Sequence, residues 1–463
     1  MGTVHHFACV LFFSSLIHIG LAISVRIENG TEEWGYEEVR PRAHMFWWLY
    51  RSPCRIEDPS KPWPIILWLQ GGPGASGVGM GNFEEVGPLD TNLNPRNSSW
   101  LQIADLLFVD NPVGAGFSYV DDKELYVKTD EEAATDLTTL LESIFSRDES
   151  LQKSPLYILA ESYGGKFAVT LGLSVLKAIE KGILNIKLGG VALGDTWISP
   201  EDFVLSWGPL LKDVSRLDDN GLEKANSLAE KIQQHIGNGE YIAATASWRQ
   251  LEENIEGNSN HVDFYNFLLD RGMDPVSIMA SQSSSPAIAT KSYSKYLSSL
   301  RLKSADGDGG ISSLMNGIIR EKLKIIPPSV KWGEQSDDVF EALIGGFMRP
   351  RINEVDELLN KGINVTIYNG QLDVICATKG TEAWVGKLKW EGLRSFLSTE
   401  RTLVHCGTDR ATGGFTKSYQ NLRFYWILGA GHFVPVDQPC VALNMVGEIT
   451  QSPAATALKS HTK

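Results

Sequence analysis

A single serine at a tight turn between a strand and a helix constrains this chain more than any other feature. Residues 155–159 form a short apolar run typical of a buried strand, and residues 166–177 have the pattern of a helix. Ser162 lies between them, with Ala160 two positions before it and Gly164 two positions after it. Such a turn requires small residues on both sides, and it lifts the serine hydroxyl above the edge of a sheet. The pattern predicts a nucleophilic serine at the carboxyl end of a strand.

Strand and helix signals alternate on both sides of this turn. Apolar runs that end in glycine-containing turns occur at residues 65–69, 106–110 and 189–194, and strand signals return at 363–368 and 424–428. A helix with an acidic first turn, which suits the helix dipole, is expected at 129–145. The alternation predicts an α/β fold with a doubly wound, mostly parallel sheet, in which ligands bind at the carboxyl ends of the strands.

A block of different character separates the two strand-rich parts of the chain. Residues 222–235 and 241–255 have the periodicity of amphipathic helices, and residues 281–304 are rich in serine. Residues 305–310 (Ala-Asp-Gly-Asp-Gly-Gly) resemble the start of a calcium loop but lack its later ligands and closing glutamate, so no metal is expected there. Polar, glycine-rich stretches bury little surface, so we expect residues 281–285 and 305–310 to be the most protease-sensitive.

These signals define the expected domains. A core built from residues 25–199 and 346–463 would carry a mostly helical cap of residues 200–345 inserted between its two parts. Residues 7–24 form an apolar segment that ends in small residues, which predicts a secretory signal over residues 1–24; an uncleaved anchor or a buried N-terminal helix is the alternative.

Composition narrows the possible partners. The chain has 42 Lys+Arg and 56 Asp+Glu, for a formal net charge of −14, which argues against a nucleic-acid partner. After residue 24 no apolar run is long enough to span a bilayer. Glycosylation triplets at Asn29, Asn97 and Asn364 agree with a secreted or lysosomal protein. The oligomeric state is left open.

The cysteines leave the disulfide pattern open. Cys9 lies within the predicted signal, and spacing does not choose among the three full pairings of the other four. These four are Cys54, Cys376, Cys406 and Cys440. So few cysteines in a chain of this length do not make a disulfide-dense scaffold, and the core must supply most of the stability.

A nucleophilic serine needs a histidine to accept its proton and an acid to orient that histidine. Asp373 stands in a turn after the strand expected at 363–368, and His432 follows the strand at 424–428 through a glycine turn. The chain order Ser–Asp–His is that of α/β-hydrolases, so we interpret Ser162, Asp373 and His432 as a catalytic triad. Asp437 is a rival acid, five residues beyond His432, and is expected to be structural. The other candidate histidines are His44, His235, His261, His405 and His461.

The oxyanion formed in acyl transfer needs fixed N–H donors. The amide of Tyr163, directly after the serine, is one candidate. The loop of residues 71–74 (Gly-Gly-Pro-Gly), which follows the strand at 65–69, is expected to supply a second amide.

Together these motifs resemble the serine carboxypeptidases, an α/β-hydrolase family of vacuoles, lysosomes and secretions. The resemblance covers most of the chain after the predicted signal, with five motifs in family order: 68–74, 109–118, 161–165, 368–373 and 431–439. Sequence variants at 45–49, 70, 82–88 and 193–199 are most similar to the retinoid-inducible branch of the family.

The resemblance implies further roles, position by position. Gly72 and Tyr163 match the oxyanion amides. Four residues match the group that binds the terminal carboxylate of the substrate: Gln70, Gly71, Glu85 and Glu161. Gln70 stands where the family has asparagine, and Glu84 is an alternative to Glu85 because this loop is one residue longer than usual. Cys376 matches a family cysteine that is usually unpaired near the pocket.

The implied activity is the release of C-terminal amino acids from peptides or proteins through an acyl-enzyme at acidic pH. The resemblance implies no cofactor and no metal. Two alternatives stay open on the same fold: an acyltransferase, or a catalytically silent secreted binding protein. We also expect Glu85 and Glu161 to share a proton, because two adjacent carboxylates cannot both ionise cheaply.

Overall fold

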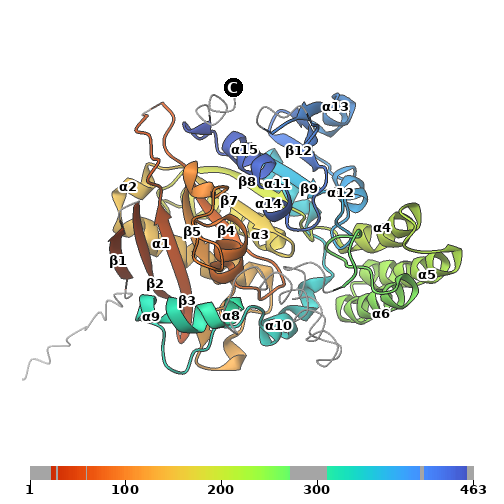
Figure 1. The fold of residues 1–463 in the computed structure, drawn as a ribbon, viewed down its shortest axis with the longest axis horizontal. Helices are drawn as coiled ribbons and strands as arrows, with labels where there is room; N and C mark the ends of the chain where they lie inside the picture. The colour runs from red at the N-terminus through yellow and green to blue at the C-terminus, as the bar shows by residue number, and fades with distance from the viewer. Residues whose placement is uncertain (1–21, 28–29, 59, 272–309, 407–410, 456–463) are drawn as a thin grey trace, which may run out of the picture.

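The computed structural model describes residues 22–27, 30–58, 60–271, 310–406 and 411–455 (Figure 1). Within these residues 12 strands form one sheet, in the order β1-β2-β3-β5-β4-β7-β8-β9-β12-β11-β10, with β6 paired to β3. The strands are β1 (Ala22–Ile27), β2 (Gly30–Arg40), β3 (Ala43–Arg51), β4 (Ile65–Leu69), β5 (Asp105–Val109), β6 (Tyr119–Val120), β7 (Leu156–Glu161), β8 (Leu188–Gly194), β9 (Val365–Gly370), β10 (Thr402–Val404), β11 (Gly414–Tyr419) and β12 (Leu422–Ile427).

The centre of the sheet is parallel and its two flanks are antiparallel. Strands β5, β4, β7, β8, β9 and β12 run parallel, whereas β1, β2 and β3 on one side and β11 and β10 on the other pair antiparallel. The predicted α/β-hydrolase sheet is therefore confirmed, with β9 and β12 supplied by the second part of the chain.

Two layers cover the sheet because alternate residues of each strand point to opposite faces. In β4, Ile65, Leu67 and Leu69 pack into one apolar cluster. That cluster contains the buried sides of α1 (Asp130–Arg147) and α3 (Gly164–Glu180). Ile66 and Trp68 of the same strand pack into a second cluster with α15 (Pro439–Ile449). Every residue of β4 is buried, so both faces of the central sheet are core.

Helix boundaries follow from capping. Helix α1 begins at Asp130 because the Thr129 side chain accepts a hydrogen bond from the Glu132 amide. Its first turn holds three acidic residues and its last turn holds Arg147, which complements the helix dipole. The remaining helices of the core are η1 (Gly77–Val86), η2 (Trp100–Gln102), η3 (Lys123–Leu125), α2 (Glu149–Gln152), α11 (Ile352–Asn360), α12 (Thr378–Val385), α13 (Leu393–Ser398) and α14 (Val434–Asp437).

The block between the two core parts is helical and divides into two groups. Helices α4 (Pro200–Asp213), α5 (Asp219–Gly237) and α6 (Tyr241–Ser259) project to one side of the sheet (Figure 1). Helices α8 (Ile311–Leu314), η5 (Met315–Ile319) and α9 (Arg320–Leu323) instead lie against the N-terminal strands. Trp34 donates a hydrogen bond to the Leu323 carbonyl at 3.1 Å, and Lys322 pairs with Glu32 at 2.6 Å. Helix α10 (Asp337–Phe347) then returns to α6.

Several sequence predictions lie outside the described residues. These are most of the signal over 1–24, the glycosylation site at Asn29, and the protease-sensitive stretches at 281–285 and 305–310 apart from Gly310. Residues 22–24 begin β1, which pairs with β2, so cleavage after residue 24 would remove the first half of that strand. In the described part of the chain, no helix combines the length and apolarity needed to cross a bilayer.

Candidate active site

The predicted turn around Ser162 is present between β7 and α3. Ser162 has φ +58°, a left-handed conformation that costs a non-glycine residue energy and persists only where surrounding contacts hold it. Its amide donates to the Gly194 carbonyl at 3.2 Å, and its carbonyl accepts from the Trp197 amide at 2.9 Å. A Cβ on Gly164 would lie 2.3 Å from the Leu69 carbonyl oxygen, so the flank of the turn must be glycine.

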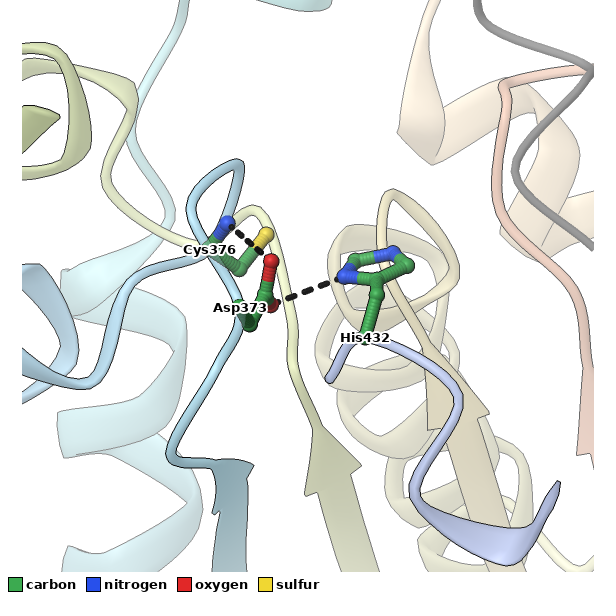
Figure 2. A group of neighbouring side chains, drawn as sticks. All are labelled: Asp373, Cys376 and His432. Atoms are coloured by element: carbon green, nitrogen blue, oxygen red, sulfur yellow. Dashed lines mark hydrogen bonds and ion pairs between the residues drawn. The ribbon is translucent and has the colours of Figure 1, made fainter. Parts of the chain in front are cut away.

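Asp373 and His432 meet at the carboxyl edge of the sheet. They stand in the turns after β9 and β12, and His432 Nδ1 lies 2.8 Å from Asp373 Oδ2 (Figure 2). Both side chains are buried. Because Nδ1 donates to the carboxylate, Nε2 carries the lone pair, and it has no hydrogen-bond partner among the described residues. The imidazole is thus oriented with its accepting nitrogen available.

Ser162 and His432 line one cleft of about 440 Å³ between the sheet edge and the cap. Of the rival groups, Asp437 accepts a hydrogen bond from the Gly431 amide at 2.7 Å and so holds the turn before His432, a structural role as expected. None of the histidines at 44, 235, 261 and 405 lines the cleft, and His461 lies outside the described residues.

A cysteine lies beside the acid and base. The ligand-type atoms of Asp373, Cys376 and His432 lie within 4.8 Å of one another, and the Cys376 amide donates to Asp373 Oδ1 at 3.3 Å (Figure 2). Burial and the Asp373 charge raise the pKa of the Cys376 thiol well above its usual range, so the sulfur keeps its proton. A protonated thiol and an aspartate already bonded to histidine are poor metal ligands. Cys376 is unpaired, whereas Cys406 and Cys440 form a disulfide and Cys54 is free and exposed.

The glycine loop after β4 closes over Ser162. A Cβ on Gly71 would lie 2.5 Å from Ser162 Cβ and 2.9 Å from its Oγ, so no larger residue fits. Gly72 has φ +102°. Among the described residues, neither the Gly72 amide nor the Tyr163 amide donates a hydrogen bond. Gln335 fixes the loop by donating to the Pro73 carbonyl at 2.7 Å, a long-range contact that the sequence did not suggest.

Gln70 joins two buried carboxyls at the inner end of the cleft. Its Nε2 donates to Glu85 Oε1 at 3.1 Å and to Glu161 Oε1 at 2.9 Å. Its Oε1 accepts from Trp68 Nε1 at 2.6 Å, which fixes the orientation of the amide. The side chain of Glu84, the alternative to Glu85, makes no hydrogen bond with the described residues. The structure thus brings Gln70, Glu85 and Glu161 together.

The surroundings of Glu85 and Glu161 favour one proton shared by the two carboxyls. Burial, followed by the Glu85 charge and the hydrogen bond to it, raises the pKa of Glu161 well above its usual range. Burial also raises the pKa of Glu85, against the opposing effect of the hydrogen bonds from Glu161 and Gln70. The arrangement matches a protonated Glu161 that donates to an ionised Glu85.

Asp195 is a site residue that sequence reasoning did not single out. It follows β8, is fully buried with φ +44°, and accepts a hydrogen bond from the Gly370 amide at 2.7 Å. Burial, the charge of Asp373 and a hydrogen bond to it raise the pKa of Asp195 well above its usual range. Its protonated carboxyl therefore donates to Asp373. The sequence feature that could have identified Asp195 is its position as an acidic residue directly after a buried strand.

Comparison with known proteins places this geometry in a family. Residues 24–452 match the family model described as serine carboxypeptidase. A serine carboxypeptidase-like protein of Arabidopsis thaliana is 66% identical over 429 residues, covering 92% of this chain and 93% of the relative. The retinoid-inducible serine carboxypeptidase of Mus musculus is 47% identical over 442 residues, covering 93% and 94%.

A solved structure agrees on the fold. A prohormone-processing carboxypeptidase from Saccharomyces cerevisiae superposes with a TM-score of 0.74 at 22% identity, covering 91% of this chain and 92% of that one. The resemblance to the retinoid-inducible branch is confirmed by the match to the mouse protein. The chain therefore belongs to the serine carboxypeptidase family, serine-type peptide hydrolases of the α/β-hydrolase fold.

Proposed function

We propose that Ser162, His432 and Asp373 cleave the last peptide bond of peptide or protein substrates through an acyl-enzyme at acidic pH. The observation that carries the proposal is the 2.8 Å bond between His432 Nδ1 and Asp373, with Nε2 in the cleft that Ser162 lines and without a partner in the described part of the chain. Nε2 takes the Ser162 proton as Oγ attacks the carbonyl, and returns it to the leaving amino group. Water then repeats the sequence to release the shortened peptide.

The oxyanion would be held by the backbone. The amides of Gly72 and Tyr163 are free of other acceptors among the described residues, and Gln335 fixes the glycine loop. Fixed amides stabilise developing charge without reorganising, which is worth roughly 10²- to 10³-fold in rate for one donor.

The substrate carboxylate would be bound by Gln70, Gly71, Glu85 and Glu161. The proton on Glu161 supports this role, because a protonated carboxyl can donate to an incoming carboxylate, whereas two ionised carboxyls would repel it. The KM for free-acid peptides should rise with pH relative to that for matched esters. We would measure both between pH 4 and 8 in wild type and in Glu161→Gln. Parallel KM profiles for acid and ester would contradict the carboxylate role.

The nucleophile is tested by labelling. A fluorophosphonate probe should modify the wild-type protein and leave Ser162→Ala unmodified, and loss of one triad member should lower the rate on the order of 10⁴- to 10⁶-fold. Blocked dipeptides incubated at pH 4 to 7 should release free amino acids. Transfer of the acyl group to an added alcohol or amine in preference to water would favour an acyltransferase, and absence of both reactions would favour a silent binding protein.

A secretory location, either secreted or lysosomal, is part of the proposal. The predicted signal over 1–24, the exposed side chains of Asn97 and Asn364, and the disulfide support an oxidising compartment. N-terminal sequencing of the mature protein should place its first residue near 22–25, with glycan on Asn97 or Asn364. A mature chain that begins at Met1 without glycan would refute the location.

A further inference from the structure

The side chain of Tyr163, the residue directly after Ser162, is held by three contacts inside the protein. Its hydroxyl donates a hydrogen bond to Asp130 Oδ1 at 2.8 Å. The ammonium of Lys166 lies over its ring, 4.5 Å from the centroid. The ring of Phe347 stacks parallel to it, with the two centroids 5.9 Å apart. Because the tyrosine is also buried, its ring has a fixed position at the start of α3.

Asp130 is a carboxylate with two cationic neighbours. Arg351 Nη2 and Nε lie 2.7 and 2.8 Å from Asp130 Oδ2, and Lys166 Nζ lies 4.0 Å from the same oxygen. All three side chains are buried, and buried charges are tolerated when they are paired. The Tyr163 hydroxyl therefore binds one oxygen of a carboxylate whose other oxygen is already fixed by Arg351.

Lys166 joins this network to the cap. Its Nζ donates to the carbonyls of Gly346 and Phe347, the last two residues of α10, with 3.1 Å to the second. Burial lowers the pKa of Lys166 to about 8, with Asp130 opposing, so the amine carries its charge in acid. A cation at the carbonyl end of a helix is favourable. Lys166 thus holds Phe347 in place, where its ring stacks on Tyr163.

The Tyr163 amide has little other support. Tyr163 caps the start of α3, but its side chain makes no capping hydrogen bond to the helix. Within the described residues the amide itself donates to no acceptor, as a group that waits for an oxyanion must. The preceding Ser162 has φ +58°, a conformation that persists only where its surroundings hold it. The orientation of this amide therefore depends on the anchored tyrosine ring.

We propose that Asp130 and Lys166 are positioning residues, which hold the Tyr163 ring so that the amide of Tyr163 points at the oxyanion. Neither side chain lines the cleft, so both act through Tyr163. The inference rests on the proposed function, since it concerns an oxyanion donor of the same site. A fixed donor stabilises the transition state more than the bound substrate. Loosening the ring should therefore lower kcat and leave KM nearly unchanged.

The first variant is Tyr163→Phe, which keeps the ring and removes its bond to Asp130. Since complete loss of one oxyanion donor costs roughly 10²- to 10³-fold, a displaced donor should lower kcat about tenfold, with KM within about twofold of wild type. Blocked dipeptides serve as substrates. Active sites are counted by titration with a fluorophosphonate, so that unfolded protein does not enter kcat.

Tyr425→Phe is the matched control. Tyr425 is also buried and donates from its hydroxyl to a carboxylate, Glu448 Oε2, at 2.8 Å, but it does not line the cleft. Both variants lose a buried hydrogen bond and should have a lower Tm. Only Tyr163→Phe should have a lower kcat. A merely structural role for the Asp130 contact would lower Tm in both variants and kcat in neither.

Lys166→Met removes the ammonium and should also lower kcat about tenfold; Lys166→Gln takes its place if the methionine variant does not fold. Adding Tyr163→Phe should then cost no more than about twofold further, because both changes loosen the same ring. A normal kcat in Tyr163→Phe, or losses that multiply in the double variant, would overturn the inference, while peptide cleavage by the wild type upholds the proposed function. Wild-type protein that cleaves no peptide and takes up no label would overturn both.

Discussion

Replacing Glu161 by glutamine should flatten the dependence of the protein's stability on pH. Glu161 is 1% exposed, and burial with the Glu85 charge raises its pKa well above the usual range. A glutamate in the unfolded chain loses its proton near pH 4.3. Above about pH 5 the folded protein therefore binds one more proton than the unfolded chain at this position. The stabilisation is complete in acid and is lost as the pH rises toward the folded pKa.

The size of the effect follows from proton linkage. One extra proton in the folded state lowers the free energy of unfolding by about 1.4 kcal/mol for each pH unit. At roughly 2 cal/mol/K of unfolding entropy per residue, 463 residues convert this slope to a Tm change of about 1.5 °C for each pH unit over which the folded protein keeps the proton. Glutamine does not ionise, so Glu161→Gln should lose this contribution to the pH dependence of the free energy of unfolding.

The measurement is the thermal midpoint by circular dichroism in half-unit steps from pH 4.5 to 7.5. Buried acids with raised pKa values that do not act on Glu161, such as Glu252, contribute to the slope of both proteins and cancel in the difference. Glu230→Gln serves as the control, because its carboxylate is exposed. Parallel curves for wild type and Glu161→Gln would refute the shared proton.

Three further outcomes follow from contacts in the core. Gly71→Ala should lower kcat/KM on the order of 10²-fold or more without unfolding the protein, because the new Cβ would lie 2.5 Å from Ser162 Cβ; near-normal activity would contradict the close approach. Asp195→Asn keeps a neutral hydrogen-bond donor toward Asp373, so activity in acid should stay within a few-fold of wild type. In a pH–rate profile, the pH at which activity falls on the alkaline side should rise, because no second negative charge can form beside Asp373. Cys440→Ser opens a disulfide that spans 34 residues and should lower the unfolding free energy by about 3 to 4 kcal/mol in denaturant titration, and an unchanged midpoint would contradict this.

The fold and the turn around Ser162 were predictable because their signals are local. A strand followed by a serine in a turn of small residues specifies β7, the turn and α3 within about 25 residues, and parallel strands bring their carboxyl ends to one edge. The boundaries of helices differ from the expected ones where the capping residue lies outside the apolar pattern. The helix expected at 222–235 spans Asp219–Gly237 in the structure, since the Asp218 side chain accepts from the Gly221 amide.

What escaped prediction depends on contacts between distant segments. Asp195 becomes part of the site only because β8 pairs with β9, which brings it to Gly370. Gln335 reaches the glycine loop across 262 positions of sequence. Such contacts carry no periodicity or spacing that a single sequence displays.

The interleaving of the sheet has a consequence for synthesis of the protein in the cell. The central strands come from both parts of the chain, because β9 and β12 extend the sheet from β8. Ser162 is made early, but Asp373 and His432 follow these two late strands. A nascent chain that ends before His432 lacks one member of the proposed triad. Under the proposed mechanism, peptide cleavage therefore begins only after 432 of the 463 residues have been joined.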